Sequence, residues 1–456
     1  MGPLDFPPYI AAILRALKDR GYSAYIVGGA VRDWLRGAVP VDYDIATAAR
    51  PEEVINLAKE KGWQVVDKLG HNFGVVLVVV GRHKAEVATF RGERYGSDSH
   101  RPAQVWYADT IEADLARRDF TINAMALTLD HRVIDPYGGQ ADLTARLIRL
   151  VGDGHVRFAE DGLRLFRACR FVAQLDFAVE EQTLGAMTAQ ISRVEGLSLA
   201  RVREELNKLI TAPAAYRGLA LLIKTGLAGA SCQTRQGGEY RSVAILPELM
   251  SVSSEASYDR PLHIMETLRH APPVAAVRWA ALFQDAQLAA GALTRLGMAA
   301  QLIKRVEWLV THHRIFHLYR HDQEKGLDWW VREQARCGQF RYNRELVQGV
   351  EDLIGLVGAQ LAAANVDSQT LSEAEAFALA LRGAARTMPV HTSDVAYKGP
   401  ELTALLGQAS LVGPFLKNVL RRIQDRELAN DRDAVAEAAR RWVSGREDNY
   451  PSVPNE

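Results

Sequence analysis

Residues 25–47, YIVGGAVRDWLRGAVPVDYDIAT, decide the fold of the first part of this chain. The β-branched and aromatic run that opens the stretch predicts a buried strand. The strand ends at Gly28 and Gly29, which let backbone N–H groups approach a ligand closely, and an amphipathic turn carrying Arg32 follows. The stretch therefore predicts a phosphate-binding turn directly after a buried strand.

Two carboxylates, Asp42 and Asp44, stand two residues apart in a β-like run that contains Val41, Tyr43 and Ile45. Because strand side chains alternate between faces, we expect both carboxylates on the same face. Like charges held side by side repel one another, and their hard oxygen atoms favour Mg²⁺. Each signal alone is more typical of a tight turn or a solvated strand edge. Their order within one strand–turn–helix–strand unit predicts a combined phosphate and metal site.

A third acid, Glu86, lies in the strand-like segment KAEVATF, on the same face as Ala88 and Phe90. Two-metal nucleotidyl transfer uses a third acid to flank the ions or to take the hydroxyl proton. An acid on a strand is as often a surface residue, and the sequence leaves both interpretations open.

Composition restricts the class of protein. The 456 residues suffice for two to four domains, and 48% hydrophobic residues can fill their cores. Lys+Arg and Asp+Glu are both 55, so a nucleic-acid partner must be bound by local basic patches. Three separated cysteines, Cys169, Cys232 and Cys337, indicate a reducing compartment. Without a leader-like segment or a membrane-length apolar run, the sequence predicts a cytoplasmic protein with no membrane partner.

The chain changes character near residue 143. Before it, two helices and three strands are expected, at residues 5–21 and 51–62, and at 64–66, 73–80 and 85–90. After it, helical periodicity continues nearly to the end, with loops expected at 231–243, 251–260 and 385–392. This pattern predicts a mixed α/β part followed by an all-helical remainder.

Two segments after the strands carry exposed charge. Residues 91–105, RGERYGSDSHRPAQV, have the composition of a mobile surface loop. In DLARRDFTINAMAL, residues 114–127, paired arginines precede an expected helix, and Arg118 could bind a triphosphate bidentately. Two exposed arginines at a helix start are the alternative.

The segment EDGLRLFRACRF, residues 160–171, predicts a helix with an apolar stripe and four polar positions at three-residue intervals: Asp161, Arg164, Arg167 and Arg170. Asp161 and Arg164 could form a simple intrahelical ion pair. Alternatively, they could read a nucleobase. A carboxylate only accepts and a guanidinium only donates, so the pair matches the amino-bearing edges of cytosine and adenine and mismatches guanine and uracil. Each mismatched polar group costs about 1–3 kcal/mol, which would select C and A without a template.

The motifs VGGAVRD, DYD, RRDFTINAMA, DPYGG and EDGLRLFRACRF, in this order, resemble the bacterial (class II) tRNA nucleotidyltransferase and poly(A) polymerase family. The resemblance implies an α+β head of the polymerase-β-like nucleotidyltransferase type, followed by all-helical neck, body and tail. We expect the head at residues 1–140, the neck at 141–210, the body at 211–330 and the tail at 331–456.

The activity implied by the resemblance is addition of CCA to tRNA 3′ ends from CTP and ATP, with Mg²⁺ and without a DNA partner. The implied roles are metal binding and catalysis by Asp42 and Asp44, while the strand pattern alone suggests Glu86 as a third catalytic acid. The resemblance also implies a set of residues that bind the nucleotide: Gly29, Arg32, Arg118, Asp161, Arg164, Arg167 and Arg170. The glycine turn adds Gly28 to this set.

Two later segments resemble the family with departures. In SLARVREEL, residues 198–206, Ala200 stands where the family usually has an acid. Residues 262–286 resemble a decayed HD phosphohydrolase module, in which Gln284 and Asp285 replace the metal-binding His-Asp pair, so we expect no hydrolase activity.

The resemblance leaves the product open, because CCA-adding, CC-adding, A-adding and poly(A)-adding enzymes share these motifs. The segment at residues 91–102 is full length, whereas CC-adding members of the family tend to lack it, so A addition is expected. The segment LGHNFGVVLV at 69–78 resembles the tRNA-specific members. A non-catalytic RNA-binding protein is a further alternative, and the sequence does not specify the oligomeric state.

Overall fold

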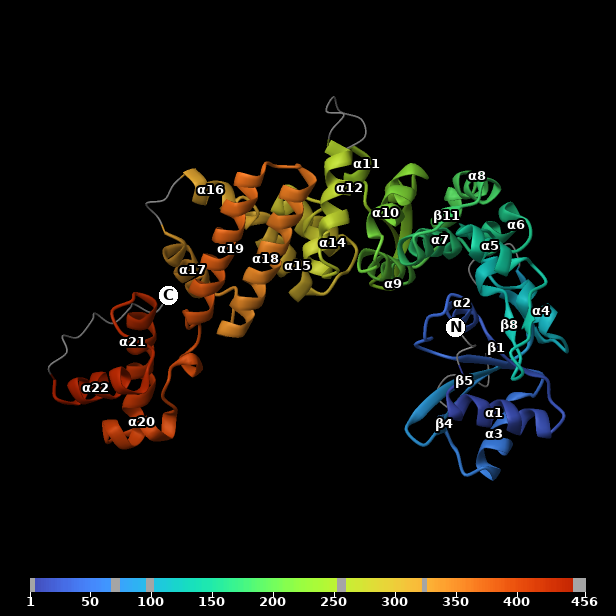
Figure 1. Ribbon diagram of the computed structural model, residues 1–456, viewed down its shortest axis with the longest axis horizontal. Coiled ribbons are helices and arrows are strands. Elements are labelled where there is room, and N and C mark those ends of the chain that lie inside the picture. The colour runs from blue at the N-terminus through green and yellow to red at the C-terminus, as the bar shows by residue number, and fades with distance from the viewer. Residues whose placement is uncertain (1–4, 67–73, 96–101, 252–259, 322–325, 446–456) are drawn as a thin grey trace. The chain divides into compact units, whose positions relative to one another are not determined.

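The computed structural model describes residues 5–66, 74–95, 102–251, 260–321 and 326–445 (Figure 1). The chain forms two compact units. The first contains Met1–Ser257 with Arg295–Gly297, and the second contains Tyr258–Thr294 with Met298–Glu456. The first unit holds every candidate site residue. The division into head, neck, body and tail stays a prediction.

A seven-stranded mixed sheet forms the first part of unit one, in the order β3-β4-β5-β2-β1-β8-β9. Strand β2 pairs with β5 in parallel, and every other pair of neighbouring strands in this sheet is antiparallel. The strands are β1 (Ala24–Val27), β2 (Asp44–Thr47), β3 (Gln64–Val66), β4 (Val75–Val80), β5 (His83–Thr89), β8 (Ala126–Leu127) and β9 (Val133–Ile134).

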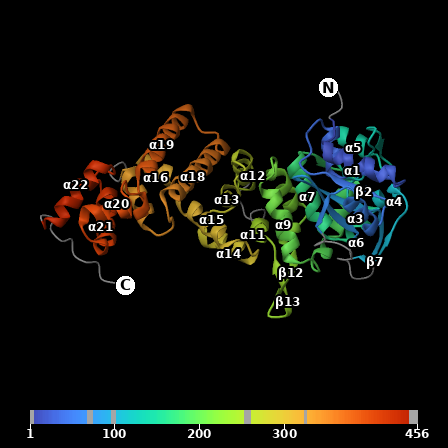
Figure 2. The ribbon, with the colours of Figure 1, turned by 90° about the horizontal axis from the view of Figure 1, so that it is seen from below.

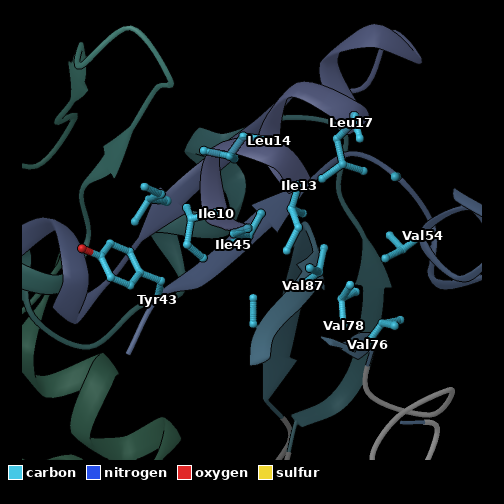
Figure 3. Close-up of a cluster of buried hydrophobic side chains, with 14 of the residues drawn as sticks. Ile10, Ile13, Leu14, Leu17, Tyr43, Ile45, Val54, Val76, Val78 and Val87 are labelled. Atoms are coloured by element: carbon cyan, nitrogen blue, oxygen red, sulfur yellow. The ribbon is translucent and has the colours of Figure 1, made fainter. Parts of the chain in front are cut away.

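The hydrophobic core of this part lies where helices α1 (Pro8–Asp19) and α3 (Pro51–Glu60) cover the sheet (Figure 3). Helix α1 contributes positions at the i, i+3, i+4, i+7 spacing of an apolar face. These residues pack with strand and α3 side chains: Ile10, Ile13, Leu14, Leu17, Ile45, Val54, Val78 and Val87. The register pairs Ile45 with Val87 and Asp44 with Glu86. Because strand side chains alternate, the core on one face leaves Asp44 and Glu86 on the opposite face.

Short elements connect the sheet to the helices of unit one. They are α2 (Gly29–Leu35), α4 (Ile111–Ala116), the 3₁₀ turn η1 (Thr121–Asn123), α5 (Gly139–Ala145) and the parallel pair β10 (Leu147–Ile148) and β11 (Ala178–Val179). The helices that follow are α6 (Gly154–Glu160), α7 (Leu163–Leu175), α8 (Glu181–Ala189), α9 (Leu199–Ile210), α10 (Ala215–Lys224) and α11 (Glu248–Ser251).

Helix α7 packs against both α9 and α10. The close approach to α10 requires Gly218, because a Cβ there would lie 2.5 Å from the carbonyl oxygen of Cys169. Figure 2 shows α7 and α9 next to each other within this unit.

Two hairpins correct the predicted loops. Residues 91–105 were expected to be a loop, but β6 (Arg91–Tyr95) and β7 (Pro102–Tyr107) pair antiparallel, and only residues 96–101 lie outside the described part. Residues 231–243 were also expected to be a loop. Instead, β12 (Ser231–Gln236) and β13 (Glu239–Ala244) form a hairpin whose turn residues, Gly237 and Gly238, both have positive φ. Such a turn suits two-residue hairpins. Residues 69–73 and 252–259, parts of two other segments discussed above, lie outside the described residues.

The described residues of unit two are helical. The helices are α12 (Arg260–His270), α13 (Ala275–Ala280), α14 (Ala286–Arg295), α15 (Ala300–His312), α16 (Ile315–His321), α17 (Leu327–Arg336), α18 (Asn343–Ala363), α19 (Ser368–Thr387), α20 (Gly399–Leu406), α21 (Val412–Gln424) and α22 (Arg432–Val443). The predicted fold class, a mixed-sheet head followed by mostly helical structure, is confirmed.

Helix α18 alone among the described helices is long and apolar enough to cross a membrane, by length and composition. It is a core helix, because half of the apolar window is buried inside unit two. Its buried Asp352 also forms an ion pair with Arg305 of α15 at 2.5 Å. A buried carboxylate with a paired guanidinium is typical of a packed protein interior.

Candidate active site

A cleft of about 1170 Å³ in unit one brings the predicted residues together. They reach it from the β1–α2 turn and α2, from the end of the α2–β2 segment and the start of β2, from the segment after α4, and from α7 with the turn before it. Ten expected residues line it: Gly28, Gly29, Arg32, Asp42, Asp44, Arg118, Asp161, Arg164, Arg167 and Arg170. Glu86 is not part of the lining but stands next to Asp44 in the sheet register.

The two aspartates share a face, as expected, although only Asp44 belongs to β2. The prediction that Asp42 lies within the strand is wrong, since the strand begins two residues later. Tyr43 between them is 8% exposed, and both neighbouring carboxylates lie on the exposed side. Because Tyr43 is buried in the core, the side chains of Asp42 and Asp44 on either side of it face the other way. Strand pairing was expected to impose this alternation.

The electrostatics of these carboxylates are unfavourable for negative charge. Burial and repulsion from Asp42 raise the pKa of Asp44 above its ordinary value, although the nearby Arg118 opposes the shift. Burial and repulsion from Asp44 and Asp42 likewise raise the pKa of Glu86. Carboxylates that repel one another in this way form a site at which a bound cation is stabilising.

The glycine turn is required by geometry. Gly28 has a φ of +72°, which disfavours other residues, and a Cβ there would lie 3.0 Å from Nη1 of Arg118. Arg32 in α2 is fixed by donating to Asn123 Oδ1 at 2.8 Å and to Asp33 Oδ1 at 2.9 Å. The turn thus lets the Arg118 guanidinium approach the backbone beside Asp44.

Arg117 and Arg118 share one buried acid. Asp114, whose side chain is 1% exposed, accepts from Arg117 Nη2 at 2.7 Å and from Arg118 Nη2 at 3.0 Å. Burial alone would raise the pKa of Asp114, but the two guanidiniums outweigh it and lower the pKa. The expected helix start is wrong here, because α4 ends at Ala116 directly before the arginines.

Asp161 and Arg164 both line the cleft, but the pair is organised differently from the expectation. Helix α7 begins at Leu163, so Asp161 precedes it and accepts the Leu163 N–H at 3.1 Å, which is a turn that Asp favours. Its other oxygen accepts from Arg201 of α9 at 2.8 Å. The intrahelical Asp161–Arg164 ion pair does not form.

Arg164 is anchored by other groups. Its Nη1 donates to the carbonyl of Arg157 at 2.6 Å and to Glu160 Oε2 at 2.8 Å. Its Nη2 donates to the carbonyl of Arg117 at 3.4 Å. Arg157 in turn donates to the carbonyl of Arg118 at 2.6 Å, so α6 and α7 hold the backbone of the segment that carries Arg118.

Arg167 and Arg170 point from α7 toward acids on neighbouring segments. Arg167 Nε donates to Asp119 Oδ2 at 2.6 Å, and Arg170 Nε donates to Glu205 of α9 at 2.5 Å. Burial would raise the pKa of Asp119, but Arg167 lowers it overall. The ring of Phe171 lies 5.6 Å from the Arg167 guanidinium and 4.1 Å from that of Arg170, within cation–π range.

Sequence reasoning missed the acids and amides that hold these arginines: Asp114, Asp119, Asn123, Glu160 and Glu205. Some signals existed. Asp114 and Arg118 have the i, i+4 spacing of a helical ion pair, but the segment was assigned to a helix start. The Arg170–Glu205 contact joins residues 35 positions apart, which single-sequence reasoning does not reveal.

Comparison with known proteins gives consistent matches. Residues 24–149 match the family model described as poly A polymerase head domain, and residues 176–230 match the probable RNA and SrmB-binding site of polymerase A. The CCA-adding enzyme of Geobacillus sp. (strain WCH70) is 43% identical over 215 residues, which are 47% of this chain and 52% of that protein. The CCA-adding enzyme of Geobacillus stearothermophilus is 41% identical over 244 residues, which are 52% of this chain and 59% of that protein. The chain thus spans about half the length of the curated relatives it matches.

Solved structures match along nearly the whole chain. The crystal structure of Bacillus stearothermophilus CCA-adding enzyme in complex with CTP has a TM-score of 0.65 at 26% identity, covering 97% of this chain and 98% of that one. Thermotoga maritima CCA-adding enzyme complexed with tRNA has a TM-score of 0.54 at 18% identity, covers 97% of each chain, and shares the fold. The predicted resemblance to the CCA-adding enzyme and poly(A) polymerase family is therefore confirmed.

Proposed function

We propose, from the premise that residues 24–149 form a poly A polymerase head domain, that this protein adds CCA, or its terminal A, to tRNA 3′ ends from CTP and ATP. The observation that carries the proposal is the single cleft lined by Asp42, Asp44, Arg118, Asp161 and Arg164. Metal-binding acids, a phosphate-binding arginine and groups able to read a base are all needed for nucleotidyl transfer, and a non-catalytic RNA-binding protein needs no such combination.

Divalent cations, which we propose to be Mg²⁺, fit the acids of this cleft. Asp42 and Asp44 offer hard oxygen donors, and the raised pKa of Asp44 and of Glu86 reflects charge that a cation would compensate. Bound there, the cations would lower the pKa of the attacking hydroxyl and offset the charge of the phosphates. We assign Asp42 and Asp44 to metal binding and Glu86 to catalysis as the flanking third acid.

In the proposed reaction the 3′ hydroxyl oxygen of tRNA attacks the α-phosphorus of CTP or ATP, and pyrophosphate leaves as the old phosphoanhydride bond breaks. Arg118 and Arg32 would bind the triphosphate, supported by the Asp114 fork and by Asn123. Gly28 and Gly29 would leave space for the phosphates at the turn.

Base choice would depend on Asp161 as acceptor and Arg164 as donor. The contacts of Asp161 with Arg201 and with the Leu163 N–H leave a carboxylate with further lone pairs for an amino group. Arg167 and Arg170 would complete the wall of the same pocket. The cation–π contacts of these two arginines hold the Phe171 ring at the cleft.

The reaction is tested by gel-resolved extension of tRNA transcripts that lack CCA, lack CA or lack A, each with CTP, ATP or both. Addition of two C residues and then one A supports the proposal. Extension only of the transcript lacking A would identify an A-adding specialist. Repeated ATP incorporation with almost no CTP incorporation would identify a poly(A) polymerase and overturn it.

The remaining parts of the proposal concern location and organisation. Three cysteines without disulfides, Cys169, Cys232 and Cys337, support a reducing, cytoplasmic location. We keep the division into head (1–140), neck (141–210), body (211–330) and tail (331–456) as part of the proposal. The helical parts would bind tRNA by shape and by phosphate contacts.

A further inference from the structure

A second pocket, in unit two, has a lining unlike that of the cleft. It has a volume of about 460 Å³ and lies where the ends of α17 and α21 meet the start of α18. We call it the Tyr342 pocket. Its lining includes Arg336, Phe340, Arg341, Tyr342, His391 and Gln424. Its volume lies within the range of about 300–1,000 Å³ that small-ligand sites occupy.

The aromatic side chains of the Tyr342 pocket form a corner. The rings of Tyr342 and His391 lie 5.4 Å apart at 70°, so one presents its edge to the other. Tyr342 is 36% exposed, although it is a large aromatic residue. His391 Nδ1 accepts the Ser393 N–H at 3.1 Å, so the neutral ring carries its proton on Nε2 and remains a donor. The Arg344 guanidinium lies over the Tyr342 ring, 5.3 Å from its centroid, so a flat heterocycle would stack on the opposite face of the ring.

The cations of the pocket are held in two ways. Arg336 is fixed, since it donates to Gln424 Oε1 at 3.0 Å and pairs with Asp425 Oδ1 at 2.9 Å. Arg341 makes a long ion pair of 3.7 Å with Glu345, and its side chain is 76% exposed. An exposed pair of this length contributes about 0–1 kcal/mol, so Arg341 can exchange it for a phosphate at little cost.

Resting on the proposed function, we propose that the Tyr342 pocket takes one unpaired nucleobase of the tRNA substrate, stacked on Tyr342, with an adjacent phosphate on Arg341. Proteins recognise single-stranded RNA mainly by stacking bases on aromatic rings beside basic side chains. Because the net charge of the chain is zero, RNA affinity must come from such local groups. An acidic peptide would engage the arginine but would leave the aromatic corner unexplained.

The test measures the dissociation constant of full-length protein for a tRNA transcript lacking CCA, by fluorescence anisotropy. Tyr342→Ala should weaken binding about 5- to 150-fold, the range of one lost base–aromatic stack, while Tyr342→Phe keeps the ring and should change binding less than about twofold. Trp329→Ala is the matched control, because Trp329 is an exposed aromatic residue of α17 outside the lining and should have no effect. Arg341→Ala should reduce the slope of log affinity against log salt by about 0.7–0.9.

Two further measurements keep the proposal falsifiable. Circular dichroism melting should show that Tyr342→Ala is folded like wild type, and a fully paired RNA duplex should bind both proteins equally. If Tyr342→Ala bound tRNA as tightly as wild type, or lost as much affinity for the duplex as for tRNA, the proposed role of the pocket would be wrong. Failure of CTP and ATP incorporation with an intact Tyr342 effect would overturn the proposed reaction and leave the pocket standing.

Discussion

Arg341 of the Tyr342 pocket in unit two is positioned in the opposite way to Arg118 and Arg170 of the cleft in unit one. In the cleft, Arg118 and Arg170 are fixed by the nearly buried acids Asp114 and Glu205. In the Tyr342 pocket, Arg341 is mostly exposed and its partner lies 3.7 Å away. The cleft is therefore preorganised for charges that must sit at fixed points. Arg341 can move to meet a charge whose position varies, such as the RNA phosphate that we propose for it.

The largest expected effect concerns the carboxylates of the cleft. Asp44→Asn should lower nucleotide incorporation by about 10³-fold or more, because a metal-binding charge is lost from the reacting centre. Burial raises the pKa of Asp44, so its ionised form opposes folding at neutral pH, and the variant should be as stable as wild type or more stable without metal. Steady-state extension assays and thermal melting check both outcomes.

Asp130→Asn serves as the control for Asp44→Asn, because Asp130 is exposed and forms a 3.9 Å ion pair with Lys18. It should leave both incorporation and melting unchanged. Undiminished incorporation by Asp44→Asn would contradict our metal assignment.

The next effect tests whether buried acids preorganise the cleft. Asp114→Asn should lower the free energy of unfolding by about 3–5 kcal/mol, because the mostly buried Arg118 loses this ion pair, while Arg117 keeps Glu93 at 3.1 Å. Asp109→Asn is its surface counterpart, because Asp109 is 92% exposed at 3.7 Å from Arg50 and should contribute less than about 1 kcal/mol. Urea unfolding measures both. Equal effects of the two variants would show that the fork does not organise the site.

A smaller effect is expected for base choice. Arg201→Ala removes the α9 anchor of Asp161 but leaves the Leu163 N–H, so the ratio of kcat/KM for CTP over UTP should fall about tenfold. Arg201→Lys should restore part of this ratio. Arg203→Ala is the control, because Arg203 on the same helix donates to the Gly297 carbonyl and should not alter selectivity. An unchanged ratio in Arg201→Ala would remove Arg201 from base reading.

The smallest effect is the response to acid. The pKa of Asp114 and of Asp119 is lowered in the folded protein, so their stabilisation is complete above the ordinary aspartate pKa near 3.8 and is lost as the pH falls through the lowered values. The free energy of unfolding of wild type should therefore fall more steeply between pH 5 and pH 2 than that of Asp114→Asn. This extra loss in acid should be smaller than the loss that the substitution itself causes. Urea midpoints across this pH range check the slope, and parallel curves would speak against the assignment.

The sequence predicted the residues of the cleft better than their contacts. The strand before Gly28, the apolar face of α1 and the alternation around Tyr43 follow from local patterns, which the structure preserves. Asp161 shows where local patterns stop. The periodicity places it in a helix with Arg164. In the structure its short polar side chain accepts the Leu163 N–H, and the helix begins only at Leu163.

The partners of the arginines and the two hairpins could not be predicted for a different reason. Glu205 and Arg201 reach the cleft from α9 because of how α7 and α9 pack, which is tertiary information. The hairpin at residues 231–244 has a polar composition typical of loops, and it is fixed at its base by a bridge between Ser198 and Gln233. A two-stranded ribbon is marginal in isolation, so its strands depend on that attachment.

The separate anchoring of Asp161 and Arg164 has a consequence for how this protein can evolve. In the base reader that we propose, the accepting Asp161 is held by Arg201 of α9, and the donating Arg164 is held by Glu160 at the end of α6. A lineage, or an engineer, can thus replace one half while the other keeps its place. Nucleotide preference is therefore open to stepwise revision, without an intermediate in which both halves are lost together.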